Sequence, residues 1–238
     1  MINNGILLAG GSGTRLKPLT NFSNKHMIPI HNKFIIDYSL QTLIDLGCKE
    51  ITVVLGGEFF QQVIQYLRSG ANWGVKFNYI LQDSPLGIAH AINLCQPYVK
   101  DNFAVVLGDN IFSDKLKCSG GPEIFLTKKR DMNRFGVASI KNGKIEKIEE
   151  KPIILDENFD NYVITGCYVF DQTFFEYFKS LVPSSRGEFE IVEIIKKYEQ
   201  DGKLRYSVYE SLWSDAGVFD TINQLNNYFY DLHTKKNC

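Results

Sequence analysis

Short apolar runs alternate with helical patterns over the first 110 residues of the chain. The apolar runs are bounded by turn residues, which predicts buried strands at 5–9, 50–55, 76–82 and 103–107. Apolar residues at helical spacing predict amphipathic helices over 36–44 and 60–67, and a short helix is expected over 87–95. Strands that alternate with helices are typical of βαβ units and a mostly parallel sheet.

Extended runs follow one another directly in the second half of the chain. They predict strands at 123–128, 136–140, 144–149, 163–170 and 204–209. Asn142-Gly143 lies between two of these runs and is a strong hairpin signal. Helices are predicted around 191–198 and 222–232. We therefore expect one α/β domain over residues 1–238, a single Rossmann-like mixed, mostly parallel sheet flanked by helices, with a smaller antiparallel part.

Composition excludes several classes of protein. The 238 residues carry 26 basic and 27 acidic side chains, a net charge of −1, so we expect no nucleic-acid or membrane partner. The five cysteines are widely spaced without a C-x-x-C pair, which predicts neither a disulfide framework nor a zinc site. No signal peptide and no apolar stretch of ~18 residues is recognisable, so a cytoplasmic protein is expected.

The loop after the first predicted strand contains Gly10, Gly11 and Gly13, followed by Arg15. Ligands of open parallel sheets bind at this position. Glycines let backbone N–H groups approach an anion, and a guanidinium suits phosphate oxygens. The loop has neither the P-loop pattern nor a dinucleotide fingerprint. On the glycines alone, a tight turn beside a surface arginine is an equally good interpretation, but Lys25 is a second cation that can reach the same crevice.

Eight short motifs follow one another along the chain: Leu8-Ala9-Gly10-Gly11-Ser12-Gly13-Thr14-Arg15-Leu16, Ser23-Asn24-Lys25, Leu107-Gly108-Asp109-Asn110, Phe135-Gly136-Val137, Glu149-Glu150-Lys151-Pro152, Thr165-Gly166-Cys167-Tyr168, Arg186-Gly187-Glu188 and Trp213-Ser214-Asp215-Ala216-Gly217. Each motif is weak alone. Together, and over nearly the whole chain, they resemble the sugar-1-phosphate nucleotidyltransferases, most closely the glucose-1-phosphate thymidylyltransferases. The resemblance implies that a sugar 1-phosphate attacks the α-phosphate of dTTP or UTP, which yields a nucleoside diphosphate sugar and pyrophosphate.

The resemblance also implies roles for residues of the amino-terminal half, 1–110. Gly10, Gly11, Gly13 and Arg15 are expected to hold the triphosphate. Arg15 and Lys25 are expected to stabilise charge on the α-phosphate and on the leaving pyrophosphate.

Base and sugar sites are implied in the same way. Gln82 and Gly87 match positions that read a pyrimidine, and a glutamine amide can accept from N3–H and donate to O4 of thymine or uracil alike. The half over 111–238 is expected to bind the sugar phosphate through four residues: Gly136 and Glu150 at the sugar hydroxyls, Lys151 and Arg186 at the phosphate.

Two anionic reactants must meet in such a reaction, and unit charges ~4 Å apart repel by roughly 4 kcal/mol at an effective dielectric near 20. Mg²⁺ is the expected cofactor, usually held by one or two carboxylates together with waters and substrate phosphates. Asp109 follows a predicted strand, so its carboxylate is expected in the crevice, although a capping role is the alternative. The resemblance makes Asp215 the second ligand, and it makes Arg15, Lys25, Asp109 and Asp215 the catalytic set.

Other interpretations stay open. The nucleotide could be UTP, the sugar could be another hexose 1-phosphate, and the chain could be a noncatalytic pyrophosphorylase-like regulator that binds a nucleotide sugar. Both carboxylates and the set of cations argue against a regulator. Taken alone, Glu149-Glu150-Lys151 is more commonly a solvated run of charges.

The chain also departs from the family pattern. His26 stands where these enzymes usually carry glutamine, and Phe135 where they carry tyrosine. The resemblance favours a homo-oligomer. Because the chain ends soon after His233, where longer members continue, we expect feedback inhibition by a distal nucleotide sugar to be absent.

Overall fold

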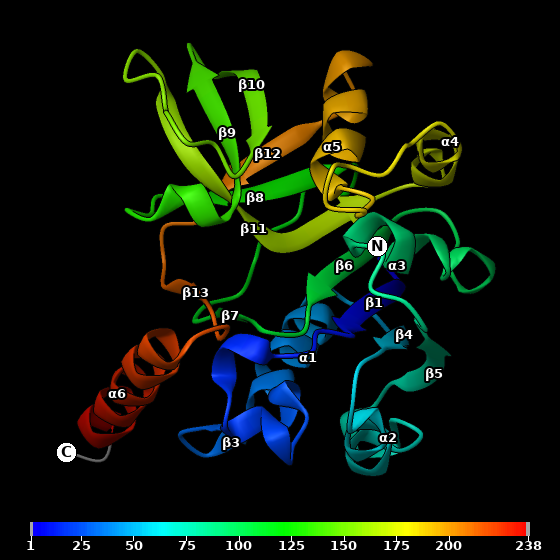
Figure 1. The fold of residues 1–238 in the computed structure, drawn as a ribbon, viewed down its shortest axis with the longest axis vertical. Coiled ribbons are helices and arrows are strands. Elements are labelled where there is room, and N and C mark those ends of the chain that lie inside the picture. The colour runs from blue at the N-terminus through cyan, green and yellow to red at the C-terminus, as the bar shows by residue number, and fades with distance from the viewer. Residues whose placement is uncertain (1, 237–238) are drawn as a thin grey trace.

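A mixed sheet of nine strands forms the centre of the computed structural model, which describes residues 2–236 (Figure 1). Its main path is β10-β9-β11-β6-β1-β4-β5. Off this path, β8 pairs with β11, and β12 pairs with β8. The amino-terminal strands β1 (Asn4–Ala9), β4 (Glu50–Leu55), β5 (Lys76–Leu81) and β6 (Phe103–Leu107) are mutually parallel. The predicted parallel half of the sheet is confirmed.

The other strands of the sheet are mainly antiparallel. They are β8 (Glu123–Thr127), β9 (Gly136–Lys141), β10 (Lys144–Glu150), β11 (Asp160–Phe170) and β12 (Arg205–Val208). β11 joins the two halves, because it pairs with β6 and also with β8 and β9. Asn142 and Gly143 connect β9 to β10 with φ values of 51° and 75°, the positive angles that a two-residue hairpin of this kind requires.

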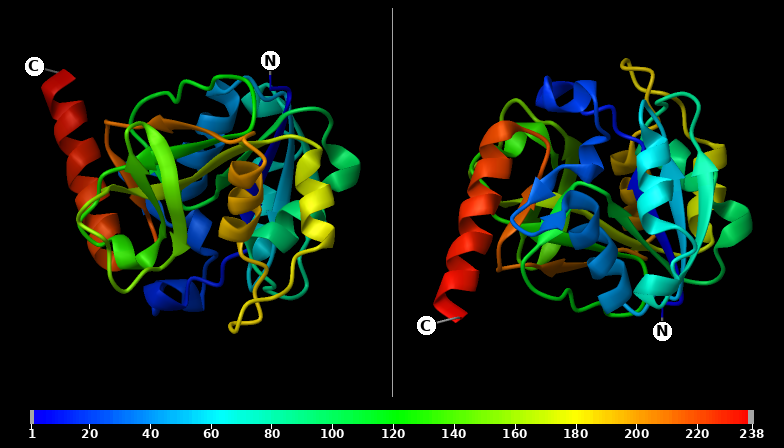
Figure 2. Two further views of the ribbon diagram at one scale, coloured as in Figure 1. Left: turned by 90° about the horizontal axis from the view of Figure 1, so that it is seen from above. Right: turned by 90° about the horizontal axis from the view of Figure 1, so that it is seen from below.

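Helices cover both faces of the sheet (Figure 2). α1 (Ile35–Asp45) and α2 (Phe60–Leu67) pack on one face. α3 (Ile88–Asn93), α4 (Thr173–Lys179) and α5 (Ile191–Gln200) pack on the other. The sequence analysis assigned no helix to α4, although its residues Phe174, Tyr177 and Phe178 stand at helical spacing, because a stripe within seven residues is short.

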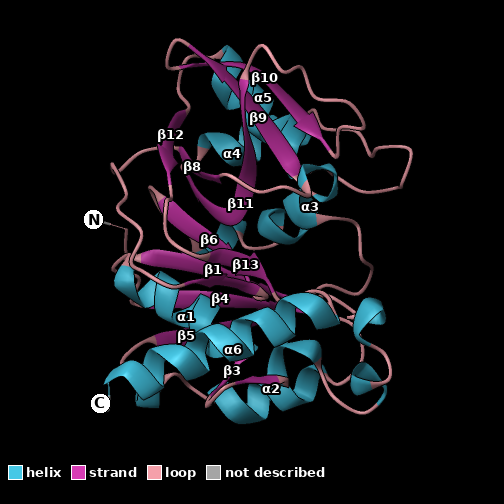
Figure 3. Cartoon of the chain, turned by 90° about the vertical axis from the view of Figure 1, so that its left-hand side faces the viewer, coloured by secondary structure: helices cyan, strands magenta, loops and turns pink. Residues whose placement is uncertain are grey.

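Two small sheets lie outside the main one. β2 (Pro29–Ile30) pairs with β3 (Lys33–Phe34), and β7 (Asn110–Phe112) pairs with β13 (Trp213–Asp215). The carboxy-terminal helix α6 (Phe219–Lys236) packs on β2 and β13 (Figure 3). Both pairs were missed in the sequence, since strands of two or three residues have no measurable periodicity. Among the described residues, no helix has the length and apolar character needed to span a bilayer.

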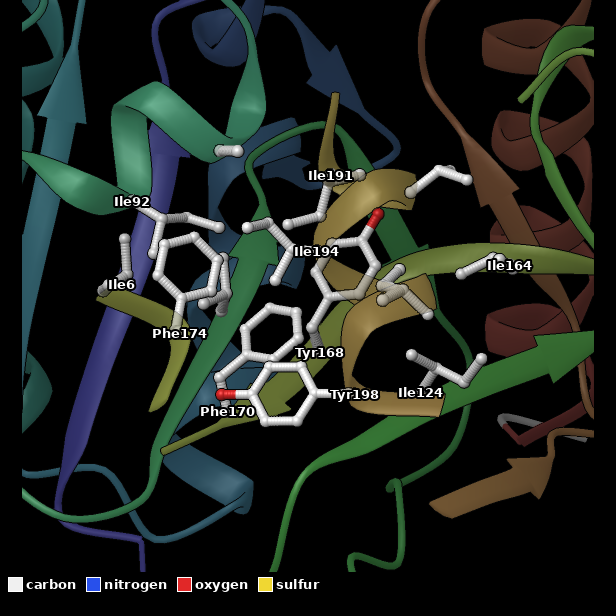
Figure 4. Packing of buried hydrophobic residues seen from close by; sticks show 14 of the residues in the cluster. Ile6, Ile92, Ile124, Ile164, Tyr168, Phe170, Phe174, Ile191, Ile194 and Tyr198 are labelled. Atoms are coloured by element: carbon white, nitrogen blue, oxygen red, sulfur yellow. The ribbon is translucent and has the colours of Figure 1, made fainter. Parts of the chain in front are cut away.

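The larger core lies between the sheet and α3, α4 and α5. Figure 4 shows Tyr168, Phe170, Phe174 and Tyr198 gathered there with isoleucines from the sheet and from α5. Phe103 of β6 is fully buried and packs against the rings of Phe170 and Phe174. This packing fixes β6, whose carboxyl end leads to Asp109.

Phe103→Ala is expected to lower the free energy of unfolding by about 3–5 kcal/mol, because it leaves a cavity beneath β6. Urea denaturation measures the loss. Phe22→Ala is the matched control, since Phe22 is 82% exposed, and it is expected to change stability by less than about 0.5 kcal/mol. Equal stabilities for the two variants would contradict this assignment of the core.

Candidate active site

The loops at the carboxyl ends of the parallel strands enclose a cavity of about 480 Å³. The glycine loop follows β1, Gln82 follows β5, and Asp109 follows β6. Because parallel strands end at one edge of the sheet, residues far apart in the chain meet there. Twelve of the thirteen predicted site residues line this cavity: Gly10, Gly11, Arg15, Lys25, Gln82, Gly87, Asp109, Gly136, Glu150, Lys151, Arg186 and Asp215.

Gly13 is the exception, since it does not line the cavity. Its φ of 64° lies in the left-handed region, and a Cβ there would meet Thr20 Cγ2 at 2.8 Å and Lys25 Cβ at 2.9 Å. Gly13 therefore shapes the loop and leaves room for Lys25. Gly11 makes similar room, because a Cβ on it would lie 3.0 Å from Lys25 Nζ.

Asp109 and Lys25 form a close ion pair in this cavity. Lys25 Nζ lies 2.6 Å from Asp109 Oδ2, and the two side chains are only 11% and 16% exposed. Burial by itself would raise the pKa of Asp109, but the charge and hydrogen bond of Lys25 hold that pKa well below its usual range. Asp109 is thus an anion at neutral pH, with a cation beside it.

Asn110 fixes the direction of the Asp109 carboxylate. Its Nδ2 donates to Asp109 Oδ1 at 2.9 Å. Its Oδ1 accepts from the backbone N–H of Gly166 at 2.9 Å and from Trp213 Nε1 at 2.8 Å. One amide therefore joins β7, β11 and β13 beneath the cavity. Asn110 belongs to the Leu107-Gly108-Asp109-Asn110 motif, but the sequence alone predicts no role for it.

Asp215 is brought beside Asp109 by the backbone. β13 pairs with β7 so that Asp215 is opposite Asn110, and the N–H of Ala216 donates to the carbonyl of Asp109 at 2.8 Å. The side chain of Asp215 is buried and receives a hydrogen bond from Arg134 Nη2 at 2.7 Å. Two acidic residues that are 106 positions apart in sequence thus stand on directly bonded segments.

Two cations around Asp215 were not predicted. Arg134 is one of them, and Lys129 Nζ is the other, 3.6 Å from Asp215 Oδ1. Lys129 Nζ is buried without a hydrogen-bond partner and lies 4.8 Å and 5.0 Å from the ring centroids of Trp213 and Phe135, where ring faces attract cations. Arg134 directly precedes the Phe135-Gly136 motif, and this position was the one feature of the sequence that could have indicated a role for Arg134 in the site.

Arg15 reaches the same place from the glycine loop. A Cβ on Gly217 would lie 3.0 Å from Arg15 Nη2 and 2.8 Å from Asp215 Oδ2. Glycine at this position therefore allows the guanidinium and the carboxylate to approach the same backbone.

The acidic residues suit Mg²⁺, which prefers oxygen ligands. Asp215 Oδ1 is buried without a hydrogen bond and has only Lys129 Nζ near it, at 3.6 Å, so a metal ion there would replace a cation that already faces this oxygen. No group of three or more His, Cys, Asp or Glu able to hold a metal occurs in residues 2–236. An ion held by Asp109 and Asp215 would therefore depend on waters and substrate phosphates for its remaining ligands.

Gly136, Glu150, Lys151 and Arg186 line the cavity as a further group. Glu150 Oε1 lies 3.3 Å from both Lys151 Nζ and Arg186 Nη2, and Glu190 Oε1 lies 2.9 Å from Arg186 Nη2. A Cβ on Gly136 would lie 3.5 Å from Glu150 Oε2. Lys151 has a φ of 46°, an unfavourable angle for lysine of the kind found at functional sites.

His26 is buried behind the ion pair. Its Nδ1 lies 2.8 Å from Asn24 Oδ1, which can only accept, so Nδ1 carries the proton. Burial, together with the charge of Lys25, lowers the pKa of His26 to about 3. The imidazole is therefore neutral at physiological pH and adds no charge to the cavity.

Comparison of the sequence with known proteins places the chain in one family. Residues 4–231 match the family model described as nucleotidyl transferase. A glucose-1-phosphate thymidylyltransferase of Neisseria meningitidis is 32% identical over 246 aligned positions, which cover 98% of this chain and 84% of that protein. Agl11 of Haloferax volcanii, a nucleotidyltransferase of low-salt glycan biosynthesis, is 35% identical over 93% of this chain, and the match spans 64% of its own length.

Solved structures give the same fold. A Bacillus anthracis protein assigned as a glucose-1-phosphate thymidylyltransferase and crystallised with sucrose superposes with a TM-score of 0.87, at 38% identity and over 94% of both chains. A UDP-glucose pyrophosphorylase in complex with UDP-glucose superposes with a TM-score of 0.83 over 97% of this chain and 99% of that one. Its identity is 21%, so that likeness concerns the fold alone.

Asn110→Ala is expected to lower the free energy of unfolding by about 2–5 kcal/mol, because it leaves the N–H groups of Gly166 and Trp213 buried without acceptors. Urea denaturation checks this value. Asn102→Ala is the control, since Asn102 donates to a carbonyl in an exposed loop. A loss for Asn110→Ala no larger than the control would show that the amide does not join these strands.

The free energy of unfolding is expected to fall as the pH drops below about 6.5. The unfolded chain binds a proton at His26 with the ordinary pKa of 6.5, whereas the folded chain stays neutral there until about 3, so protons favour the unfolded state between these values. The slope from this group is about 1.4 kcal/mol per pH unit. Urea unfolding at pH 7, 6 and 5 measures it. His26→Gln should remove most of this slope between pH 6 and 5, and an unchanged slope would refute the assignment.

Proposed function

Because the chain belongs to the nucleotidyl transferase family, we propose that it transfers a nucleotidyl group from dTTP or UTP to glucose 1-phosphate and releases pyrophosphate. Sugar-1-phosphate nucleotidyltransferases act on a nucleoside triphosphate and a sugar 1-phosphate. The preference for dTTP and glucose is supported by the names of relatives at 32–38% identity. The observation that supports the proposal is the placement of two largely buried acids, a glycine loop and several cations around one cavity.

No general base is required for the nucleophile. A phosphate monoester carries about −1.5 to −2 charges at pH 7, so an oxygen of the sugar phosphate is already anionic. This oxygen forms the new bond to the α-phosphorus. The bond from the α-phosphorus to the bridging oxygen of the β-phosphate breaks, and its electron pair leaves with pyrophosphate. The protein's contribution is positioning and charge compensation.

The cavity is lined by several cations, as two phosphates require. Arg15 and Lys25 would bind the triphosphate, and Lys151 and Arg186, which line the same cavity, would bind the sugar phosphate. Lys25, Lys151 and Arg186 are at present paired with carboxylates, so substrate phosphates would exchange with those acids as partners. Each cation is thereby held in place before the substrate arrives.

Asp109 and Asp215 would hold Mg²⁺ in this scheme. When bound, the ion supplies positive charge between the phosphates and orients them. The residues around it have separate tasks. Asn110 fixes the Asp109 carboxylate, and Arg134 and Lys129 compensate the charge of Asp215.

The experiment that tests the function measures pyrophosphate release across a grid of nucleoside triphosphates and sugar 1-phosphates, with the product identified by mass spectrometry. Release is expected only when both substrates are present, and most strongly for dTTP or UTP with glucose 1-phosphate. A protein that binds nucleotide sugars but releases no pyrophosphate with any pair would instead be the noncatalytic regulator.

Asp109→Asn and Asp215→Asn are each expected to lower turnover by about 10²- to 10³-fold with the fold intact, because each removes one anion from the proposed metal site. Asp114→Asn is the control, since Asp114 is an exposed acid five residues beyond Asp109. The readouts are pyrophosphate release and a thermal melt. Near-normal turnover in either site variant would remove that acid from catalysis.

A further inference from the structure

The amide of Gln82 is held from one side of the cavity. Its Nε2 lies 3.3 Å from the carbonyl oxygen of Gly87 and 2.9 Å from Nδ1 of His90. A carbonyl oxygen only accepts hydrogen bonds, so the nitrogen of the amide, and not its oxygen, must face Gly87. Oε1 points the other way, 3.6 Å from the position that a Cβ on Gly10 would take. The oxygen thus faces the glycine loop.

The same geometry determines the state of His90. Gln82 Nε2 carries two hydrogens, and Gly87 accepts only one of them. The second is directed at His90 Nδ1, which must then be an unprotonated acceptor, with the ring proton on Nε2. Burial lowers the pKa of His90, which favours this neutral form at physiological pH.

Packing holds both acceptors in place. Gly87 has a φ of 96°, and a Cβ on it would meet the carbonyl oxygen of Phe189 at 2.8 Å, so glycine is required there. The ring of His90 is stacked on the ring of Phe189, with centroids 6.1 Å apart. The backbone of Phe189 is bonded on both sides, to Leu86 and to Ala89.

The consequence is that Gln82 can only accept at the base, so the donation to O4 expected from the sequence is not available. Both of its amide hydrogens are used within the protein, so the group it presents to the cavity is the oxygen. Uracil and thymine carry a hydrogen on N3 and can donate to that oxygen. Cytosine carries a lone pair on N3, which the oxygen would repel. A reversed amide would direct its oxygen at the carbonyl oxygen of Gly87, which can only accept, and it could bond to His90 only if Nδ1 carried the ring proton.

We propose that His90 is the positioning residue for base discrimination. It holds the Gln82 amide with Oε1 toward the base, so that the site takes nucleotides whose base offers an N3–H and rejects cytosine. This inference rests on the proposed function, because it concerns the nucleotide subsite of that reaction. It distinguishes uracil and thymine from cytosine, and it does not distinguish uracil from thymine.

The test removes the acceptor on residue 90 and then restores it. His90→Leu has a similar branched shape without an acceptor, and His90→Phe keeps an aromatic ring against Phe189 without an acceptor. His90→Asn carries an oxygen one bond beyond Cγ, where Nδ1 stands in the histidine ring. The measured quantity is the ratio of kcat/KM for CTP to kcat/KM for UTP, with one sugar 1-phosphate throughout.

His90→Leu and His90→Phe are each expected to raise this ratio about three- to tenfold, the value of one hydrogen bond, through KM rather than kcat. His90→Asn is expected to restore a ratio near that of the unaltered protein. An unchanged CTP-to-UTP ratio in both His90→Leu and His90→Phe would overturn the inference. A ratio in His90→Asn that is raised as much as in those two variants would also overturn it. Neither result would contradict the proposed function, because the variants would still release pyrophosphate.

Calorimetry separates this inference from the proposed function. The titrants are UDP and CDP, whose binding requires no turnover. Tighter binding of UDP than CDP, lost in His90→Leu and retained in His90→Asn, supports the inference even if the protein releases no pyrophosphate. Equal affinity for UDP and CDP in the unaltered protein contradicts it.

Discussion

Two largely buried carboxylates, held on directly bonded segments of the chain, are the constraint on which the site depends. Asp109 and Asp215 must each be compensated, because a buried charge that loses its partner costs about 3–5 kcal/mol. Lys25 compensates the first, and Arg134 with Lys129 compensates the second. The cations lie on two separate segments, Lys25 at the start of a 3₁₀ turn and Lys129 with Arg134 between β8 and β9, so compensation also holds these segments at the cavity.

The proposed base and sugar subsites are joined by one segment, 184–190. Phe189 in this segment donates its N–H to Leu86 at 2.8 Å, and its ring lies on His90 beside Gln82. Arg186 in the same segment contacts Glu150 at 3.3 Å. The segment therefore contacts groups at both proposed subsites, which suits a reaction that needs both substrates in line.

Local signals in the sequence predicted the parallel strands and the place of the site. Apolar runs gave β4 and β6 with their observed ends, and the glycines after β1 indicated a phosphate loop. Lys25 was predicted as a cation of the crevice, but its bond to Asp109 was not. The pairing of β7 with β13 joins segments about a hundred residues apart, and Lys129 stands among other charged residues, so neither has a local signature. Contacts between residues far apart in the sequence determine both the β7–β13 pair and the position of Lys129 beside Asp215.

The central claim is that Asp109 and Asp215 share one divalent ion beside the nucleotide. Electron paramagnetic resonance of Mn²⁺, titrated into the protein with UDP present, tests it most directly because free and bound Mn²⁺ give different signals. The account predicts one tight site in the unaltered protein, weakened at least tenfold by Asp109→Asn and by Asp215→Asn. Mn²⁺ affinity unchanged in both variants would contradict it.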